Sequence, residues 1–373
     1  MKTAIPVEQG DVVGAVRRFL RSLLDSGVVE ALYVPLEIED GAVLPALVTD
    51  ADKLASANPL APVMPINGAR AVAALTDKHA PAKIGAVMRP CDIRALVELV
   101  KLQQATLEGV TLIGIDCLGT YEVTDYIPRR RAGTEDLDAY LAAAHEGRDP
   151  ALEGLALRPA CQMCVTPEPS NAAVHIHLLG VDTHPAIPVT MADDLAAQLG
   201  LTADPTPANG RQAAVDKLTA ARSQTRQEQL TAVRTQMNAN GGINSLFSTC
   251  IRCHNCMTVC PICYCKTCLF KSASFDHRPE HYLHAAQRKG ALRMMSDTML
   301  FHVTRMNHMA TSCVSCGMCT SACPSDIPVG TIFSAVGEQV QAAFGYQPGI
   351  NPDEPLPLVT FQESEWTEIG ESK

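Results

Sequence analysis

Two closely similar runs of cysteines lie in the C-terminal third of the 373-residue sequence. In each run three cysteines are separated by two residues, and a fourth follows after three residues and precedes a proline. The runs are Cys250-x2-Cys253-x2-Cys256-x3-Cys260-Pro261 and Cys313-x2-Cys316-x2-Cys319-x3-Cys323-Pro324. This spacing lets a short loop place three thiolates around a cubane, and the proline then turns the chain away. The pattern is typical of ligands to [4Fe–4S] clusters.

In proteins with two such runs, the fourth cysteine of each run ligates the other cluster. We therefore expect a first set of ligands, Cys250, Cys253, Cys256 and Cys323, and a second set, Cys313, Cys316, Cys319 and Cys260. The alternative is a zinc-stabilised interaction protein. Zinc sites usually use pairs of CxxC separated by a longer gap, so two complete copies of the longer run favour clusters.

Three more cysteines follow the first run in the segment Pro261-Ile-Cys-Tyr-Cys-Lys-Thr-Cys268. Cys263, Cys265 and Cys268 can be buried thiols beside the first cluster, alternative ligands or part of another site. The sequence leaves their role open, because both sets are complete without them.

A further constellation lies in the N-terminal half. Residues 83–88 and 110–115 are short apolar strands, and Asp92 can cap a helix between them. This strand–helix–strand crossover predicts two parallel strands whose carboxyl ends share one edge of a sheet. Cys91 and Cys117 follow those ends directly, and Cys161-x2-Cys164 supplies another pair of thiols. We expect these four cysteines, the third set, to hold a third cluster.

Composition limits the function classes. Net charge is -10, which disfavours nucleic-acid binding, because that function needs cations to neutralise phosphates. The N-terminus lacks a long apolar stretch and no membrane span is evident, so we expect a soluble cytoplasmic protein. Eleven of the fifteen cysteines lie within residues 250–323. In a reducing compartment this favours metal ligation over disulfides.

Local signals predict several other elements. Asp11 is expected to cap an amphipathic helix that Gly27 ends, and Pro45 restricts the strand-like run 42–48 to a sheet edge. Prolines between residues 133 and 210 favour short strands and turns over long helices. A long helix is expected between the two cysteine runs, from near Pro279 past Met299.

Histidines give weaker signals. His175 and His177 would share one face of a strand, but no carboxylate partner is evident for a metal, so we expect backbone groups to satisfy their rings. The histidines at 281, 284, 302 and 308 flank the second cysteine run and could tune a cluster or ligate haem, but their spacing indicates nothing more specific than a helix surface and an interface.

The predicted fold class is an α/β N-terminal domain with a parallel strand–helix–strand core, joined to a mainly α-helical dicluster ferredoxin domain. At 373 residues more than one domain is expected. The boundary is placed after the Pro-Thr-Pro segment at residues 205–207. The expected segments are the α/β domain (1–208), a helical linker (209–239), the ferredoxin domain (240–345) and an extended C-terminal tail (346–373).

Two resemblances follow from these motifs. The long separation between the runs resembles the α-helical ferredoxins of succinate dehydrogenase and heterodisulfide reductase subunits. Arg-Pro-Cys91-Asp-Ile-Arg-Ala-Leu96, the strand-ending Cys117 and Cys161-x2-Cys164 resemble the β subunits of coenzyme F420-reducing hydrogenases and F420-dependent formate dehydrogenases. That resemblance covers roughly residues 10–190 and implies a [4Fe–4S] cluster beside a flavin.

One stretch departs from this family. Where the family has a glycine-rich segment after the CxxC pair, this chain has residues 170–180 with a single glycine. A flavin diphosphate needs close backbone approach, which glycine permits. The departure disfavours F420 and leaves both an FAD-containing and a flavin-free protein open.

The sequence therefore predicts an iron–sulfur electron-transfer subunit of a multi-subunit redox complex. It would relay electrons between a hydrogenase or formate dehydrogenase-like partner and a flavin or a further redox partner. The alternative is a flavin-free relay that links to a heterodisulfide reductase-type module. No residues resemble a molybdopterin or nickel site, so the primary catalytic site is expected on another chain and no catalytic residue is assigned.

Overall fold

The computed structural model describes residues 1–76, 83–152, 154–203, 210–291, 294–295, 297–357 and 359. The Pro-Thr-Pro segment predicted as a linker, and most of the predicted tail, lie outside these residues. Within the described ranges, none of the helices combines the length and the apolar character that a membrane crossing requires.

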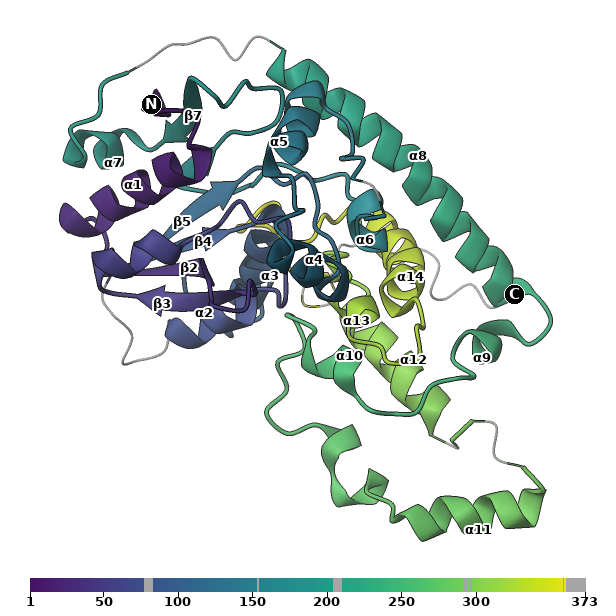
Figure 1. Ribbon diagram of the computed structural model, residues 1–373. Helices are drawn as coiled ribbons and strands as arrows, with labels where there is room; N and C mark the ends of the chain where they lie inside the picture. The colour runs from purple at the N-terminus through teal and green to yellow at the C-terminus, as the bar shows by residue number, and fades with distance from the viewer. Residues whose placement is uncertain are drawn as a thin grey trace, which may run out of the picture.

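A seven-stranded mixed sheet forms the N-terminal part (Figure 1). Its strands are β1 (Lys2–Pro6), β2 (Ala31–Glu37), β3 (Val43–Val48), β4 (Ile84–Met88), β5 (Val110–Ile115), β6 (Val174–Ile176) and β7 (Ala186–Met191). Their order across the sheet is β1-β7-β6-β5-β4-β2-β3. The central strands β2, β4, β5 and β6 are parallel, whereas β1 and β7 at one side and β3 at the other pair antiparallel.

Helices surround the sheet and form most of the C-terminal part. They are α1 (Val12–Asp25), α2 (Ala69–Leu75), α3 (Pro90–Lys101), α4 (Val123–Arg131), α5 (Leu137–Glu146), α6 (Pro159–Gln162), α7 (Asp193–Gln198), α8 (Arg211–Asn238), α9 (Gly242–Leu246), α10 (Asn255–Thr258), α11 (Pro279–Lys289), α12 (Thr298–Met309), α13 (Met318–Ser321) and α14 (Val329–Ala343). Three short 3-10 helices are η1 (Ala51–Ser56), η2 (Leu269–Lys271) and η3 (Ala273–Phe275).

The predicted crossover is confirmed, because β4 and β5 are parallel with Ile84 opposite Val110 and α3 connects them. All five residues of β4 are buried, as expected for a parallel strand covered on both faces. Successive side chains point to opposite faces. Val87 therefore packs in the core that contains α1, whereas Ala86 packs in the core that contains α2 and α3.

The predicted first helix and the edge strand are also confirmed. The Asp11 carboxylate accepts a hydrogen bond of 2.8 Å from the Gly14 backbone N–H and caps α1. β3, which contains Pro45, lies at one edge of the sheet, where proline is tolerated because one side of the strand bonds to no other strand.

The start of α3 differs from the prediction. Arg89, not Asp92, is the capping residue, and Asp92 lies in the first turn of the helix. Its carboxylate accepts the backbone N–H groups of Arg89 and Gly68, each at 3.1 Å. Asp92 therefore fixes both the helix start and the loop before α2, and it places Cys91 in the first helical turn.

One helix prediction is wrong. The single long helix expected between the cysteine runs is two helices, α11 and α12, because Gly290 adopts φ +73° and ends the first of them. The described residues between 133 and 203 form short elements, as expected. The longest of them is the ten-residue α5, which lies before the prolines of this region and begins where Asp136 caps it.

Helix α8 joins the two parts of the chain. The helix predicted up to residue 238 is present as 28 residues, Arg211–Asn238, and Figure 1 shows it running from the sheet to α14. Arg226 and Arg234 of α8 both form ion pairs with Glu338 of α14, at 2.9 and 2.6 Å. At the other end Arg211 pairs with Asp116, which follows β5.

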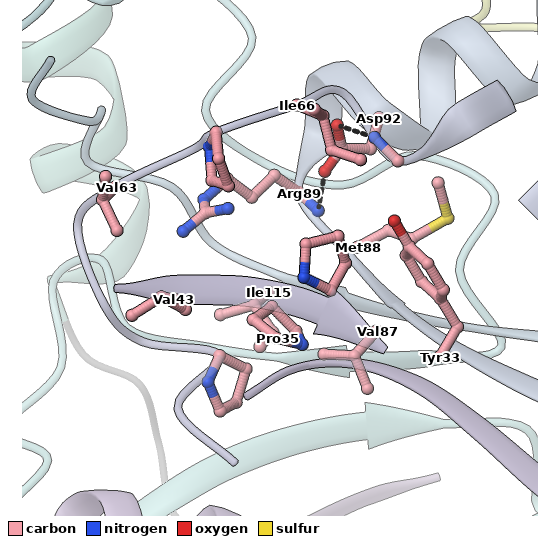
Figure 2. A pocket seen from close by; sticks show the side chains of 14 residues that line it. Tyr33, Pro35, Val43, Val63, Ile66, Val87, Met88, Arg89, Asp92 and Ile115 are labelled. Carbon is pink, nitrogen blue, oxygen red and sulfur yellow. Dashed lines mark hydrogen bonds between the residues drawn. The ribbon is translucent and has the colours of Figure 1, made fainter. Parts of the chain in front are cut away.

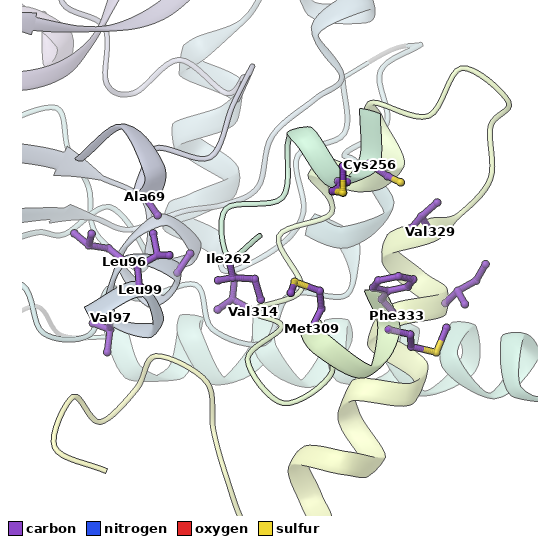
Figure 3. Packing of buried hydrophobic residues seen from close by; sticks show 14 of the residues in the cluster. Ala69, Leu96, Val97, Leu99, Cys256, Ile262, Met309, Val314, Val329 and Phe333 are labelled. Carbon is purple, nitrogen blue, oxygen red and sulfur yellow. The ribbon is translucent and has the colours of Figure 1, made fainter. Parts of the chain in front are cut away.

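The two parts also share one hydrophobic core (Figure 3). Leu96 and Leu99 of α3 are at most 1% exposed and belong to the same buried group as Ile332 and Phe333 of α14. Val314, which lies between the first two cysteines of the second run, belongs to it as well. Burial of apolar surface at about 25 cal/mol per Å² makes such a shared core the main force that holds the parts together.

The beginning of the predicted extended tail packs against α3 of the same chain. Glu98 of α3 is completely buried, and its Oε1 accepts hydrogen bonds from the Tyr346 hydroxyl and from the Gly349 backbone N–H, the latter at 2.7 Å. Gly349 adopts φ +70°, and a Cβ atom there would lie 2.1 Å from the Arg94 carbonyl oxygen. Residues 346–349 therefore hold a fixed position against α3.

This contact predicts a difference between two glycine substitutions. Gly349→Ala should displace the segment and leave the buried Glu98 carboxylate with fewer donors, at a cost of roughly 2 kcal/mol of unfolding free energy. Gly345→Ala is the matched control, because Gly345 also has positive φ but no atom lies within 4 Å of its Cβ position. Urea unfolding of both variants measures the difference, and equal losses would contradict the tail contact.

Candidate iron–sulfur centres

The two cysteine runs follow the same backbone path. In each, the residue before the second cysteine and the residue after it have positive φ: Arg252 (+56°) and His254 (+60°) in the first run, Ser315 (+57°) and Gly317 (+73°) in the second. Non-glycine residues rarely adopt this conformation, and it tends to be retained at functional sites. It curls the loop so that the Arg252 backbone N–H donates to Cys250 Sγ at 3.4 Å.

Each run ends on a short helix. Cys256 lies on α10 and Cys319 on α13, the two helices contact one another, and the fourth cysteine of each run follows its helix. This paired arrangement brings the end of each run beside the beginning of the other. It is the arrangement that crossed ligation requires.

All four cysteines of the first set line one apolar cavity, together with Phe301, Ile327 and Val329. Burial, with contributions from the other three cysteines of the set, raises the pKa of Cys256 to about 11, and the opposing effect of Arg305 is smaller than that of burial. Cys323 thus lies with the first run, although it belongs to the second run in sequence. Four convergent sulfur donors in an apolar cavity fit a [4Fe–4S] cluster.

The four cysteines of the second set also lie close to one another. Burial raises the pKa of Cys319 well above its usual value, and the other three cysteines of the set, including Cys260, add to this effect. Burial likewise raises the pKa of Cys316 to about 12, with Cys260 and Cys313 contributing. Such thiols are protonated without metal, so binding of iron must displace their protons.

The third set lies at the carboxyl edge of the sheet. Cys91 lies in the first turn of α3, directly after β4, and Cys117 follows β5, as the crossover predicts. Burial raises the pKa of Cys117 to about 11, and Cys161 and Cys164 contribute to the shift. Burial also raises the pKa of Cys91, with contributions from Cys117, Cys164 and, from the second set, Cys316. The four N-terminal thiols therefore converge, and they do so next to the second set.

Cys161 has a more polar environment than its neighbours. Its Sγ accepts the Thr120 backbone N–H at 3.4 Å and faces the Arg158 guanidinium at 3.8 Å. Burial would raise the pKa of this thiol, but Arg158 and Thr120 together outweigh burial and lower it. Gly119, at φ +107°, permits this approach, because a Cβ there would lie 3.1 Å from Cys161 Cβ and 2.9 Å from Leu157.

Several side chains around the thiols were not predicted from the sequence. Arg305 Nη1 donates to Cys256 Sγ at 3.1 Å, and His302 Nε2 lies 3.2 Å from Cys250 Sγ. His302 is 1% exposed and stacks on Phe247, so it lies at a buried interface and not on the helix surface. Burial lowers its pKa to about 3, so the ring is neutral and can donate one N–H to the sulfur. No local motif marks either residue, because both reach the first run from α12.

The expectation for His175 is also corrected, because it has a carboxylate partner. His175 Nε2 lies 2.6 Å from Asp116 Oδ1, and Asp116 also accepts the backbone N–H groups of Leu178 and Leu179 and pairs with Arg211. Burial would raise the pKa of Asp116, but His175 and Arg211 hold it well below its usual range. With a guanidinium already on the carboxylate, the Asp116–His175–His177 group is an ion-pair network and not a metal site.

This network bears on flavin binding. The segment that the family resemblance associates with a flavin contains Leu178 and Leu179, and their backbone N–H groups are bonded to Asp116 at 2.9 and 3.0 Å. These donors are therefore not free for a diphosphate. In this conformation the backbone at Leu178 and Leu179 therefore does not fit a flavin diphosphate.

A pocket lies at the carboxyl ends of β2, β4 and β5 (Figure 2). It is lined by Tyr33, Met88, Arg89 and Asp92 among others, and Figure 2 shows Asp92 bonded to backbone at its rim. Its volume is about 30 Å³, enough for one or two water molecules. A flavin ring would require this pocket to open.

The three remaining cysteines lie beside the second set. Burial raises the pKa of Cys263 to about 11, with contributions from Cys260, Cys265 and Cys268. Cys265 is exposed, and Cys268 Sγ contacts Met257 Sδ at 3.7 Å. Each of the three sets already has four cysteines, so the structure assigns no ligand role to Cys263, Cys265 or Cys268.

Comparison with known families agrees with the paired runs. Residues 246–327 match the family described as "4Fe-4S dicluster domain". This segment contains all eight cysteines of the two runs. The chain is an iron–sulfur protein. Its dicluster domain occupies the part in which the first and second sets converge.

Two curated relatives extend the likeness to almost the whole chain. The "F420-dependent formate dehydrogenase 1 subunit beta" of Methanococcus maripaludis is 28% identical over 388 residues, with 94% of each chain covered. The "F420-dependent formate dehydrogenase subunit beta" of Methanocaldococcus jannaschii is 25% identical over 383 residues, with the same coverage. A solved chain of the F420-reducing [NiFe] hydrogenase complex from Methanosarcina barkeri aligns with a TM-score of 0.43 at 12% identity, covering 62% of this chain and 92% of that chain. The two curated relatives confirm the resemblance to β subunits of F420-dependent formate dehydrogenases that the sequence predicted.

Proposed function

We propose that the chain is an electron-transfer subunit of a multi-subunit redox complex, with [4Fe–4S] clusters held by the first, second and third sets. The observation that best supports this proposal is that twelve thiols converge into three neighbouring sets of four. When bound, each cluster takes up and releases one electron at a time. The protein supplies the sulfur ligands, the apolar surroundings and the order in which the clusters follow one another.

The neighbours of the thiols support a linear order. Cys316 of the second set contributes to the raised pKa of Cys91 in the third, and Arg305 lies among thiols of both the first and the second sets. The second set therefore lies between the other two. Electrons would pass from the third set through the second to the first, or in reverse.

The first set lies near the protein surface, where it could exchange electrons with another protein. Cys253 is exposed, and the adjacent Ile251 is 56% exposed. Redox partners exchange electrons through small apolar contacts beside a cofactor edge, which this surface resembles.

The relatives favour a particular kind of partner. They are named as β subunits of F420-dependent formate dehydrogenases, so we propose a formate dehydrogenase-like or hydrogenase-like catalytic chain as one partner. A heterodisulfide reductase-type module is the alternative at the other end of the relay. The proposed division follows residues 1–208, 209–239, 240–345 and 346–373, the third segment being an α-helical dicluster ferredoxin domain in a cytoplasmic protein.

A flavin is the second candidate feature. The pocket in Figure 2 lies at the same sheet edge as Cys91 and contains Arg89, which favours a site for a planar anionic group if the pocket opens. Two observations disfavour a flavin. The pocket has a small volume, and the backbone N–H groups of Leu178 and Leu179 are already bonded to Asp116. F420 binding by this chain has no supporting contact among the described residues.

Cofactor analysis of anaerobically purified protein tests the proposal. We expect about twelve irons and about twelve acid-labile sulfides per chain, with a brown colour. A colourless sample with neither would contradict the electron-transfer function and favour zinc. Denaturation of the same sample separates the two versions: about one released flavin per chain supports the flavin-containing subunit, and none supports the flavin-free relay.

A further inference from the structure

Two buried arginines lie between the sets of thiols without a carboxylate partner. Arg158 and Arg305 are each 3% exposed, and the ion pairs within the described part of the chain include neither of them. Other buried arginines differ: Arg222 pairs with Asp149 at 2.7 Å. A buried cation needs a compensating charge, so Arg158 and Arg305 must find theirs elsewhere.

For Arg305, the compensating charge comes from thiols of the first and second sets. Its Nη1 donates to Cys256 Sγ and its Nη2 to the Cys256 carbonyl oxygen, both at 3.1 Å. Its guanidinium lies over the ring of Phe333, 5.0 Å from the centroid, which fixes its position. Burial lowers the pKa of Arg305, but thiols of both sets outweigh burial and raise it.

Arg158 occupies the corresponding place between the second and third sets. Its Nη2 donates to the Cys316 carbonyl oxygen at 2.9 Å and lies 3.8 Å from Cys161 Sγ. Nε donates to Thr120 Oγ1 at 3.0 Å, and Nη1 contacts Met318 Sδ at 3.1 Å. One guanidinium thus touches residues that carry ligands of two different sets.

We propose that Arg158 and Arg305 are positioning residues that raise the reduction potentials of the clusters on either side of them. The inference rests on the proposed function, because it requires clusters at these thiols. One-electron reduction adds one negative charge to a cluster and neither forms nor breaks a bond. A fixed cation nearby stabilises the reduced form, and the low dielectric of the interior strengthens the effect.

The test is an anaerobic redox titration of the full chain with dithionite as the electron donor, followed by electron paramagnetic resonance. In Arg305→Gln, we expect the equilibrium for reduction of the cluster of the first set to shift at least tenfold toward the oxidised form, which is about 59 mV for one electron. Arg158→Gln should shift the cluster of the third set in the same direction. The lysine variants should restore most of each shift, because they keep the charge.

Arg234→Gln is the matched control, since Arg234 pairs with Glu338 and contacts no thiol. Its potentials should equal those of the wild type. Glutamine variants with full iron and sulfide content but unchanged potentials would overturn the inference and leave the proposed function intact, whereas a wild type without iron removes both. If a glutamine variant does not retain its clusters, the lysine variant decides: a shift of tenfold or more in that variant contradicts a role for charge.

Discussion

Cys323→Ala is expected to open the first set and not the second, although Cys323 ends the second run. Under native anaerobic conditions, iodoacetamide should then label Cys250, Cys253 and Cys256, while Cys313, Cys316 and Cys319 stay protected. The physical reason is that Cys323 lines the same cavity as the first three cysteines of the other run. Iron content should fall from about twelve toward about eight per chain, and mass spectrometry of the labelled peptides measures which set is lost.

The substitution Cys260→Ala is the reciprocal test, because Cys260 ends the first run but belongs to the second set. It should expose Cys313, Cys316 and Cys319 to labelling and leave the first run protected, because Cys260 lies with the second set. The pair of variants is its own control, since both remove one fourth cysteine that precedes a proline. Labelling of the same run as the mutated cysteine in both variants would show that each run holds its own cluster.

The second large effect is expected at Asp116. Asp116→Asn removes the charge from a completely buried carboxylate that His175, Arg211 and two backbone N–H groups contact. The arginine then keeps only Glu168, whose side chain is 37% exposed, as a counter-charge. We expect a cost near the lower end of the roughly 3 to 5 kcal/mol that breaking a buried ion pair takes from the unfolding free energy. Because Arg211 begins α8 and Asp116 precedes Cys117, the cluster of the third set should also be lost fastest to a chelator.

The pH dependence of this effect has a definite sign. Since the folded protein holds the pKa of Asp116 below its usual value, its contribution is complete above about pH 4 and is lost as the pH falls toward the folded-state pKa. The difference between wild type and variant should therefore shrink in acid. Asp136→Asn, at the exposed cap of α5, should cost less than about 1 kcal/mol. Chemical unfolding at pH 7 and at pH 3, which lies below the ordinary aspartate pKa, measures both. A loss at Asp116 no larger than at Asp136 at pH 7, or a loss at Asp116 that does not shrink at pH 3, would contradict the network.

Sequence patterns predicted the elements whose signals are local. The β4–α3–β5 crossover places Cys91 and Cys117 at one sheet edge because apolar runs and a helix start are enough to define it. The cap of α3 was misassigned because Asp92 acts from the first turn and also binds Gly68, which no sequence pattern shows. The break at Gly290 was missed because a glycine inside a helical pattern does not by itself identify a left-handed residue.

The surroundings of the thiols depend on contacts between distant residues. Arg158 and Cys316 are 158 positions apart, and His302 reaches Cys250 from 52 positions away. Such contacts exist only after the helices pack, so residue spacing predicted the ligands and not the groups beside them. The assignment of the twelve cysteines to three clusters stays a prediction, which the convergence of the thiols supports.

The contact between α3 and the end of the chain has a consequence for assembly on the ribosome. Arg94, three residues after Cys91, donates to the carbonyl of Pro348, 254 positions later. The N-terminal thiols therefore emerge and wait while most of the polypeptide is still being made. We expect iron and sulfide to reach these thiols more easily before the segment around Pro348 packs against α3 than afterwards.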